Sequence, residues 1–143
     1  MIAAFDAASA EVGAELPEFV DAPATRTDYV RYQGASGDMN PIHHDEPFAR
    51  EAGFPTVFAV GMLQAGILGS FLADLVGPEH VRRFKVQFRE QSWPGDVITY
   101  GGRVVDRREA ADGSVELDLE LHATRQTGTP HLLGRATVTA PAR

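Results

Sequence analysis

The longest helical pattern in this 143-residue chain reads Gly61-Met62-Leu63-Gln64-Ala65-Gly66-Ile67-Leu68-Gly69-Ser70-Phe71-Leu72-Ala73-Asp74-Leu75-Val76. Apolar or small residues fill almost every position, and only Gln64, Ser70 and Asp74 interrupt them. A helix that is apolar nearly all round belongs in the interior of a protein. We therefore expect a buried central helix about 24 Å long, at roughly 1.5 Å per residue. Gly77-Pro78 is expected to end it.

The sequence after this helix alternates apolar and polar residues, which is typical of strands with one face in water. Phe84, Val86 and Phe88 begin the alternation, which continues in three further segments: 97–105, 115–121 and 132–140. The turns between these segments are predicted at Pro94-Gly95-Asp96, Asp112-Gly113 and Thr127-Gly128. One buried helix followed by antiparallel strands predicts an α+β fold in which a curved sheet wraps around the helix, a hot-dog arrangement. We expect residues 1–143 to form this single domain.

The residues before the central helix predict shorter elements. Residues 1–24 are expected to contain a short strand with loops. Thr27-Asp28 could cap a helix from Tyr29 to about Ala35. A second short helix is expected to start at Asp45-Glu46-Pro47 and to end at Gly53.

The loop between these elements reads Ser36-Gly37-Asp38-Met39-Asn40-Pro41-Ile42-His43. Asn-Pro favours a turn, and proline keeps the residue before it out of the helical region. Asp38 and His43 are therefore expected on a bent loop, and a carboxylate and an imidazole that meet at one point can activate a water. The alternative is structural, with Asp38 capping a nearby amide and His43 a half-buried ring.

The composition excludes several classes of protein. The net charge is −7, which argues against a nucleic-acid partner. No apolar run reaches the roughly 18 residues that a membrane span needs, so no membrane partner is expected. The chain has no cysteine, which excludes disulfides and a cysteine nucleophile and fits a cytoplasmic protein.

Charged residues suggest two further sites. The densest basic cluster is Arg82, Arg83, Lys85 and Arg89, which could bind phosphates or could be an ordinary wet strand face. His43-His44-Asp45-Glu46 contains metal-ligand types, but adjacent side chains rarely aim at one point, so no metal site is predicted. The remaining histidines, which are His80, His122 and His131, are expected at the surface.

The loop around Asp38 and His43 resembles the signature of the MaoC-like, (R)-specific enoyl-CoA hydratases. The resemblance covers most of the chain, because it extends to further segments in the expected order: Ala59-Val60-Gly61-Met62-Leu63, Phe88-Arg89 and Pro94-Gly95-Asp96. Val60 departs from the pattern, since the family usually has histidine there, and Gln91 stands where proline is common.

The resemblance implies an activity and its residues. The family adds water to trans-2-enoyl thioesters, or removes it from (R)-3-hydroxyacyl thioesters, in fatty acid metabolism. It implies that Asp38 and His43 are catalytic, that the N–H of Gly61 binds the oxyanion, and that Asn40 supports the loop. For the phosphates of coenzyme A or of an acyl carrier protein, the candidate binding residues are Arg89, Arg83 and Lys85. The thioester is the substrate, and no cofactor is expected.

The family also implies a dimer, and three versions of the function stay open. The chain could be a homodimeric enzyme, one subunit of a heteromeric dehydratase with a second hot-dog partner, or a hot-dog protein that binds acyl thioesters without turnover. A thioesterase on the same fold is a further alternative, because fold alone does not fix chemistry.

Overall fold

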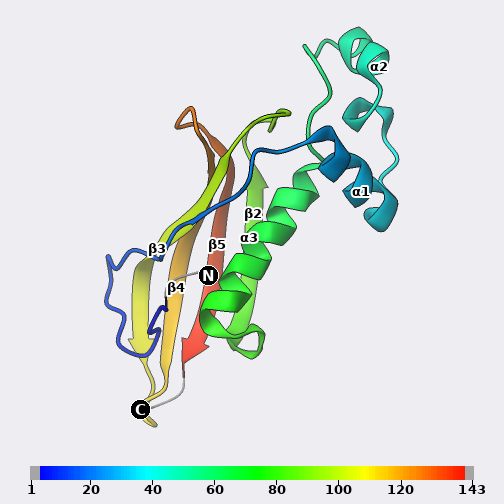
Figure 1. Ribbon diagram of the computed structural model, residues 1–143. Helices are drawn as coiled ribbons and strands as arrows, with labels where there is room; N and C mark the ends of the chain where they lie inside the picture. The colour runs from blue at the N-terminus through cyan, green and yellow to red at the C-terminus, as the bar shows by residue number, and fades with distance from the viewer. Residues whose placement is uncertain (1–3, 141–143) are drawn as a thin grey trace.

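The computed structural model describes residues 4–140. It contains a five-stranded antiparallel sheet with the strand order β1-β3-β4-β5-β2. The strands are β1 (Phe19–Val20), β2 (Val81–Phe88), β3 (Ile98–Glu109), β4 (Val115–Arg125) and β5 (Pro130–Ala140). Helix α3 (Gly61–Val76) lies along one face of this curved sheet (Figure 1). The predicted α+β class with a central helix is confirmed.

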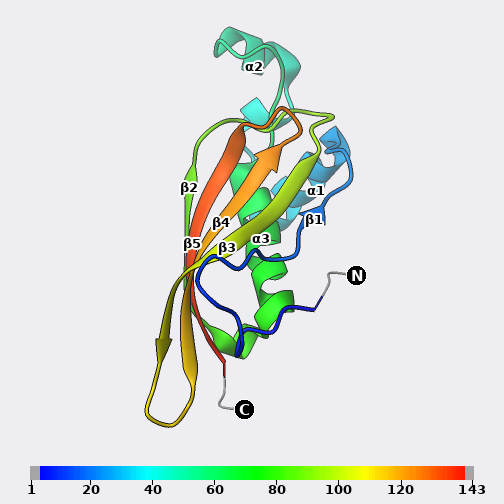
Figure 2. The same ribbon diagram turned by 90° about the vertical axis from the view of Figure 1, so that its left-hand side faces the viewer.

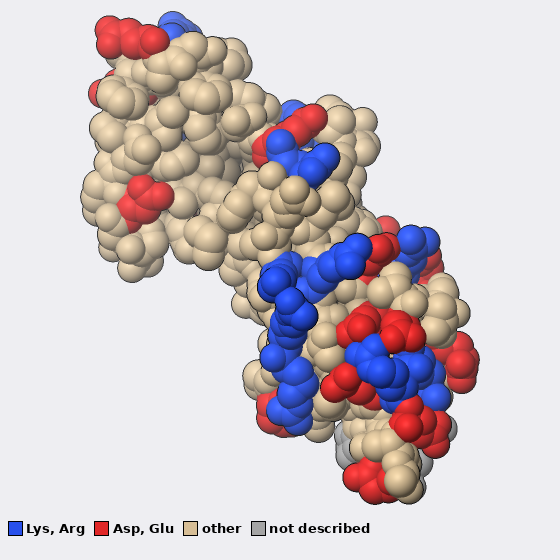
Figure 3. All heavy atoms as spheres, turned by 180° about the vertical axis from the view of Figure 1, so that it is seen from behind, with Lys and Arg blue, Asp and Glu red and all other residues tan. Residues whose placement is uncertain are grey.

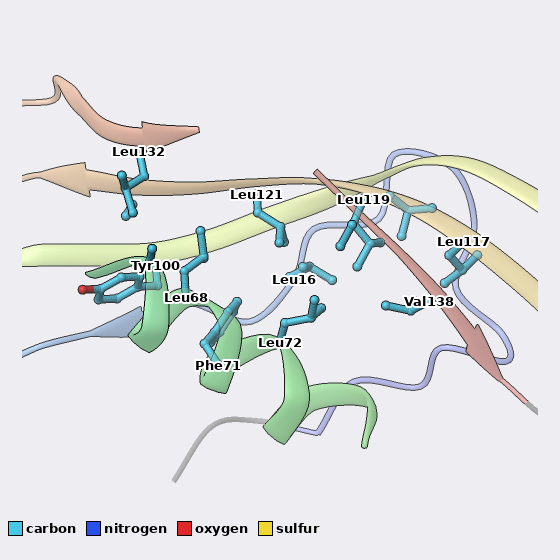
Figure 4. Packing of buried hydrophobic residues seen from close by; sticks show 14 of the residues in the cluster. Leu16, Leu68, Phe71, Leu72, Tyr100, Leu117, Leu119, Leu121, Leu132 and Val138 are labelled. Carbon is cyan, nitrogen blue, oxygen red and sulfur yellow. The ribbon is translucent and has the colours of Figure 1, made fainter. Parts of the chain in front are cut away.

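Helix α3 packs on the sheet through one of its sides. Leu68, Phe71 and Leu72 are buried and lie toward the sheet residues Leu117, Leu119, Leu121, Leu132 and Val138 (Figure 4). The prediction of a helix buried all round is wrong for the side of α3 that faces away from the sheet. A stripe at every fourth position is exposed, consisting of Met62, Gly66, Ser70 and Asp74. No helix in residues 4–140 is long and apolar enough to cross a membrane.

The short helices gather at one end of the molecule, beyond the first turn of α3 (Figures 1 and 2). They are α1 (Arg26–Ser36), the 3-10 turn η1 (Pro41–His43) and α2 (Glu46–Glu51). A second 3-10 turn, η2 (Pro78–His80), follows the C-terminal end of α3 and is not part of this group. As predicted, Asp45 caps α2, where its carboxylate accepts a hydrogen bond from the Phe48 N–H. This end of the molecule carries the loop with Asp38 and His43.

Several boundaries differ from the sequence prediction: strand β2 starts before Phe84, β4 continues past residue 121, and β5 starts before residue 132. Helix α1 starts three residues earlier than Tyr29, because Thr25 is the cap: its hydroxyl accepts from the Asp28 N–H, and the Asp28 carboxylate accepts from the Thr25 N–H. Strand β3 continues to Glu109, past the predicted end at residue 105. The pairing with β4 shifts its register between Val104 and Asp106, so the alternation breaks there although the ladder continues.

Candidate active site

Gln33 holds the candidate catalytic loop in shape from inside. This side chain on α1 is only 2% exposed. Its amide nitrogen donates to the backbone carbonyls of Asp38 and Asn40, at 2.8 and 3.0 Å, and its amide oxygen lies 2.9 Å from His44 Nδ1. The His44 ring is therefore engaged with α1 and does not join His43. One side chain thus fixes the backbone at both Asp38 and Asn40.

Hydrogen bonds within the loop complete its bend. The Asp38 carboxylate accepts from the Asn40 N–H at 3.2 Å, and the Asn40 side chain accepts from the Ile42 N–H at 3.1 Å, which caps η1. Asn40 therefore holds the loop bend, and its support of catalysis stays a prediction. The structural alternative for Asp38 was that its carboxylate caps a nearby amide. That contact is also present, and it uses only Oδ1 of the carboxylate.

The other oxygen of Asp38 faces His43. Asp38 Oδ2 lies 4.0 Å from His43 Nε2. This distance is too long for a direct hydrogen bond, but a water about 2.8 Å from each atom fits between them. The His43 side chain is nearly buried, whereas the Asp38 side chain is about half exposed. The two groups predicted to share one water are therefore placed to do so.

The His43 ring is fixed in one orientation by Phe58. Its Nδ1 lies 2.8 Å from the Phe58 carbonyl oxygen, and its ring meets the Phe58 ring edge-on with centroids 5.2 Å apart. A carbonyl only accepts, so Nδ1 carries the hydrogen in the neutral ring. Nε2 then carries the lone pair, on the side that faces Asp38. This tautomer leaves the acceptor nitrogen of His43 near Asp38, and the role of His43 as a base stays a prediction.

A cavity of about 350 Å³ opens beside His43. Its lining residues come from η1, the loop before α3, the first residue of α3, the end of β2 with the segment after it, and the start of β5: His43, Phe58, Ala59, Gly61, Phe88, Arg89, Glu90, Gln91 and His131. Segments that are far apart in the sequence thus meet around one imidazole. The predicted residues His43, Gly61 and Arg89 are all brought together here, with Asp38 next to His43.

The first turn of α3 reaches this cavity without a side-chain cap. Val60 is the N-cap residue, and its apolar side chain cannot accept a hydrogen bond from the turn. The backbone N–H groups at the start of a helix lack partners within the helix and lie at the positive end of its dipole. Because Gly61 lines the cavity, its N–H can bind a developing negative charge. A Cβ at this position would lie 2.7 Å from the Phe88 ring, so glycine leaves room for that ring.

The predicted phosphate-binding residues divide between the two faces of the sheet. Arg89 lines the cavity. Phe84 packs against α3, so its neighbours Arg83 and Lys85 point to the opposite face, where they line other depressions. Figure 3 shows basic side chains gathered in a row beside a cluster of mixed charge. Within one chain, Arg83 and Lys85 therefore do not reach the cavity, and their role in binding substrate stays a prediction.

Asp96 joins the segment after β2 to the end of β4 through hydrogen bonds. It is buried, accepts from the Trp93 N–H and from Arg125 Nε, each at 2.7 Å, and also accepts from the Gln126 amide. Burial raises the pKa of Asp96, but the hydrogen bonds from Arg125, the Trp93 N–H and Gln126 outweigh it, so the pKa lies below its usual range. The network ties the turn at residues 94–96 to the end of β4.

His131 was expected at the surface, and that prediction is wrong. The ring is buried and lines the cavity. The chain after β2 crosses over it, with the Arg89 N–H donating to the His131 carbonyl at 2.9 Å. Gln33 and Phe58 were also missed, because their roles rest on backbone contacts that no local pattern indicates.

Within residues 4–140, no group of three or more His, Asp or Glu side chains is arranged to hold a metal.

The chain belongs to the MaoC-like domain family, whose model matches residues 8–124. A 3-hydroxybutyryl-CoA dehydratase of Methylorubrum extorquens is 34% identical over 90 residues, which cover 62% of this chain and 56% of that protein. The chain spans only 6% to 56% of the length of the curated relatives that it matches. The family contains hydro-lyases that act on acyl thioesters.

Solved structures of the family have the same hot-dog fold. An (R)-hydratase from A. caviae involved in PHA biosynthesis superposes with a TM-score of 0.78 at 24% identity, covering 93% of this chain and 98% of that one. The ChsH1-ChsH2 complex from Mycobacterium tuberculosis gives a TM-score of 0.76 at 20% identity, covering 90% and 97%. At these identities the likeness concerns the fold.

Proposed function

We propose that this protein is a hydro-lyase that interconverts trans-2-enoyl thioesters and (R)-3-hydroxyacyl thioesters of coenzyme A or acyl carrier protein. The observation that carries the proposal is the 4.0 Å separation of Asp38 Oδ2 and His43 Nε2 beside a cavity that Gly61 lines. Membership of the MaoC-like family and the similarity to a 3-hydroxybutyryl-CoA dehydratase support it.

In the hydration direction, one water held between Asp38 and His43 attacks C3 of the enoyl group. The pair takes one proton from this water, the new C3–O bond forms, and electrons of the C2=C3 bond move to the thioester oxygen. The resulting enolate oxygen accepts a hydrogen bond from the Gly61 N–H, an interaction whose loss costs roughly 3–4 kcal/mol in comparable sites. Return of the proton to C2 completes the addition of water and restores the pair. Dehydration follows the same steps in reverse.

The cavity also suggests where the carrier lies. Arg89 lines it and supplies a positive charge, which suits a phosphate of the carrier near the entrance. Phe88 on the same segment provides apolar contact for the thioester or the acyl chain. Phe88 is the last residue of β2 and Arg89 follows it, so the carrier is expected to pass over the end of that strand.

The test measures the loss of enoyl absorbance with short-chain and long-chain enoyl-CoAs. Asp38→Asn and His43→Ala should each lower kcat/KM by roughly a hundredfold or more. Glu79→Gln and His80→Ala are matched controls, because they form a similar pair, 3.7 Å apart, outside the cavity, and should keep the wild-type rate. Chiral analysis of the product should give the (R) alcohol. An active wild-type protein whose rate survives both changes would overturn the assignment, and release of free thiol would indicate a thioesterase.

A heteromeric version of this function is compatible with the apolar residues around the site. Met39 is next to Asp38, Met62 is next to Gly61, and both are more than half exposed. Strand β2 is an edge strand that pairs only with β5. A second MaoC-like subunit could cover this surface, as two chains assemble in the ChsH1-ChsH2 complex. This version predicts that the purified chain is inactive alone and gains activity with such a subunit.

A further inference from the structure

His131 is a histidine of the cavity that the proposed mechanism leaves unused. It is the second residue of strand β5 and is 2% exposed, and it lines the same cavity as His43 and Gly61. The segment 89–91 encloses it, because the backbone of Arg89 bonds to its carbonyl and the Glu90 carbonyl bonds to its ring. The ring is therefore held in place by backbone on two sides.

The hydrogen bond to Glu90 decides which ring nitrogen carries the hydrogen. His131 Nδ1 lies 2.5 Å from the Glu90 carbonyl oxygen, which only accepts, so Nδ1 is the donor. Nε2 is then an acceptor with a free lone pair, and it has no hydrogen-bond partner among the residues that the structure describes. A buried acceptor without a partner is costly, so such a group in a native cavity calls for a donor.

The surroundings of His131 keep the ring neutral. Burial, and to a smaller extent the charge of Arg125, lower its pKa, against the opposing effects of the Glu90 hydrogen bond and Asp96. The Asp96 carboxylate is already engaged by Arg125, Trp93 and Gln126. A neutral ring with hydrogen on Nδ1 can accept at Nε2 and cannot donate there.

His131 differs from the other buried groups that lack a partner. Within residues 4–140 these others are Tyr29 Oη, Gln64 Oε1, Ser92 Oγ, Tyr100 Oη and Arg107 Nε. None of them belongs to a residue that lines the cavity beside His43. His131 thus combines an unmet acceptor with a place in the candidate active site.

We propose that His131 Nε2 accepts a hydrogen bond from an N–H or O–H group of the bound acyl thioester and so sets which thioesters the cavity prefers. The ligand class rests on the proposed function. An acyl thioester of this kind has two sources of such a donor: an amide N–H of the pantetheine arm and the hydroxyl at C3 of the hydrated acyl group. His131 holds the ligand, while Asp38 and His43 perform the proton transfers.

The test observes the ring directly in the wild-type protein. Long-range proton–nitrogen NMR of protein carrying nitrogen-15 histidine follows Nε2 of His131, assigned by its loss in His131→Gln. Butyryl-CoA cannot be hydrated, so a change of the Nε2 shift toward a hydrogen-bonded acceptor at saturation indicates the amide. If the Nε2 shift changes with (R)-3-hydroxybutyryl-CoA but not with butyryl-CoA, the donor is the hydroxyl. An unchanged Nε2 resonance with both saturating ligands would overturn the proposal.

Variants give a second measurement by calorimetry of ligand binding. His131→Phe removes the acceptor and should weaken binding of the responding ligand roughly twofold to tenfold, the size of one neutral hydrogen bond. His131→Gln has both a donor for Glu90 and an acceptor, and should restore most of the affinity. His122→Phe is the matched control outside this cavity and should bind as the wild type does. Equal affinity of His131→Phe and wild type would contradict the proposal.

These measurements separate two kinds of failure. If the wild-type protein hydrates no enoyl thioester, either alone or with a second MaoC-like subunit, the proposed function fails, while the NMR response to butyryl-CoA still decides whether His131 binds the thioester. If the enzyme is active and the Nε2 resonance stays unchanged, the function stands and only the role of His131 is lost.

Discussion

Gly61 and Phe88 are in such close contact that residue 61 has no room for a side chain. A Cβ there would lie 2.7 and 2.9 Å from two atoms of the Phe88 ring. Both residues line the candidate active site, and Phe88 is half exposed, so its ring can move. Gly61→Ala should therefore displace the ring in the cavity and lower kcat/KM roughly tenfold or more, because small misplacements near the reacting atoms are costly.

The control for this change is Gly66→Ala on the same helix. Residue 66 is exposed, and an added Cβ would have nothing within 4 Å. Alanine should raise the free energy of unfolding by about 0.5–1 kcal/mol and leave the rate unchanged. Thermal unfolding and kcat/KM should be measured for both variants. A Gly61→Ala enzyme with the wild-type rate would show that the Phe88 contact does not shape the site.

Gln33→Leu tests whether α1 holds the catalytic loop. The change removes the donor to the Asp38 and Asn40 carbonyls. We expect the free energy of unfolding to fall by about 1–3 kcal/mol and kcat to fall roughly tenfold to a hundredfold, since the Asp38 carboxylate loses its fixed position. Gln87→Leu on the exposed part of β2 is the control for the loss of an amide. A variant with lower stability but the wild-type kcat would mean that Gln33 only stabilises the fold.

Asp96→Asn should change stability in a pH-dependent way. The pKa of Asp96 is held below its usual range in the folded protein, so the carboxylate stabilises the fold above its unfolded pKa of about 3.9 and loses this effect as pH falls through the lower folded value. At neutral pH the variant should lose about 3 kcal/mol, because the nearly buried Arg125 loses its close carboxylate partner and keeps only Glu90, 3.7 Å away. The difference from wild type should shrink in acid. Urea unfolding at several pH values measures it, with Asp74→Asn as an exposed control.

Local patterns predicted the parts of the fold that depend on local sequence. The bounds of α3 match the predicted Gly61 and Val76, because the mostly small and apolar run ends at Gly77-Pro78. The turn at Asp112-Gly113 lies between β3 and β4, as the alternation indicated. The start of α1 was missed, since Thr25 and Thr27 are both reasonable caps and only the backbone decides between them.

The site could be predicted only in part, because burial by distant segments has no local signal. Asp38 and His43 were named from a motif, and the fold brings them near one point. His131 precedes the inward-facing Leu132, so alternation places it outward, and only the crossing of residues 89–90 buries it. Gln33 looks like any polar helix residue, since its partners are in the loop that follows α1.

A double-mutant cycle on Asp38 and His43 tests the central claim most directly. The measurement is kcat/KM for a short enoyl-CoA with wild type, Asp38→Asn, His43→Ala and the double variant. If both groups act on the same water, the double variant should be about as slow as the slower single variant, because the second change removes nothing more. Two losses that multiply in the double variant would contradict the account, since the two groups would then act independently.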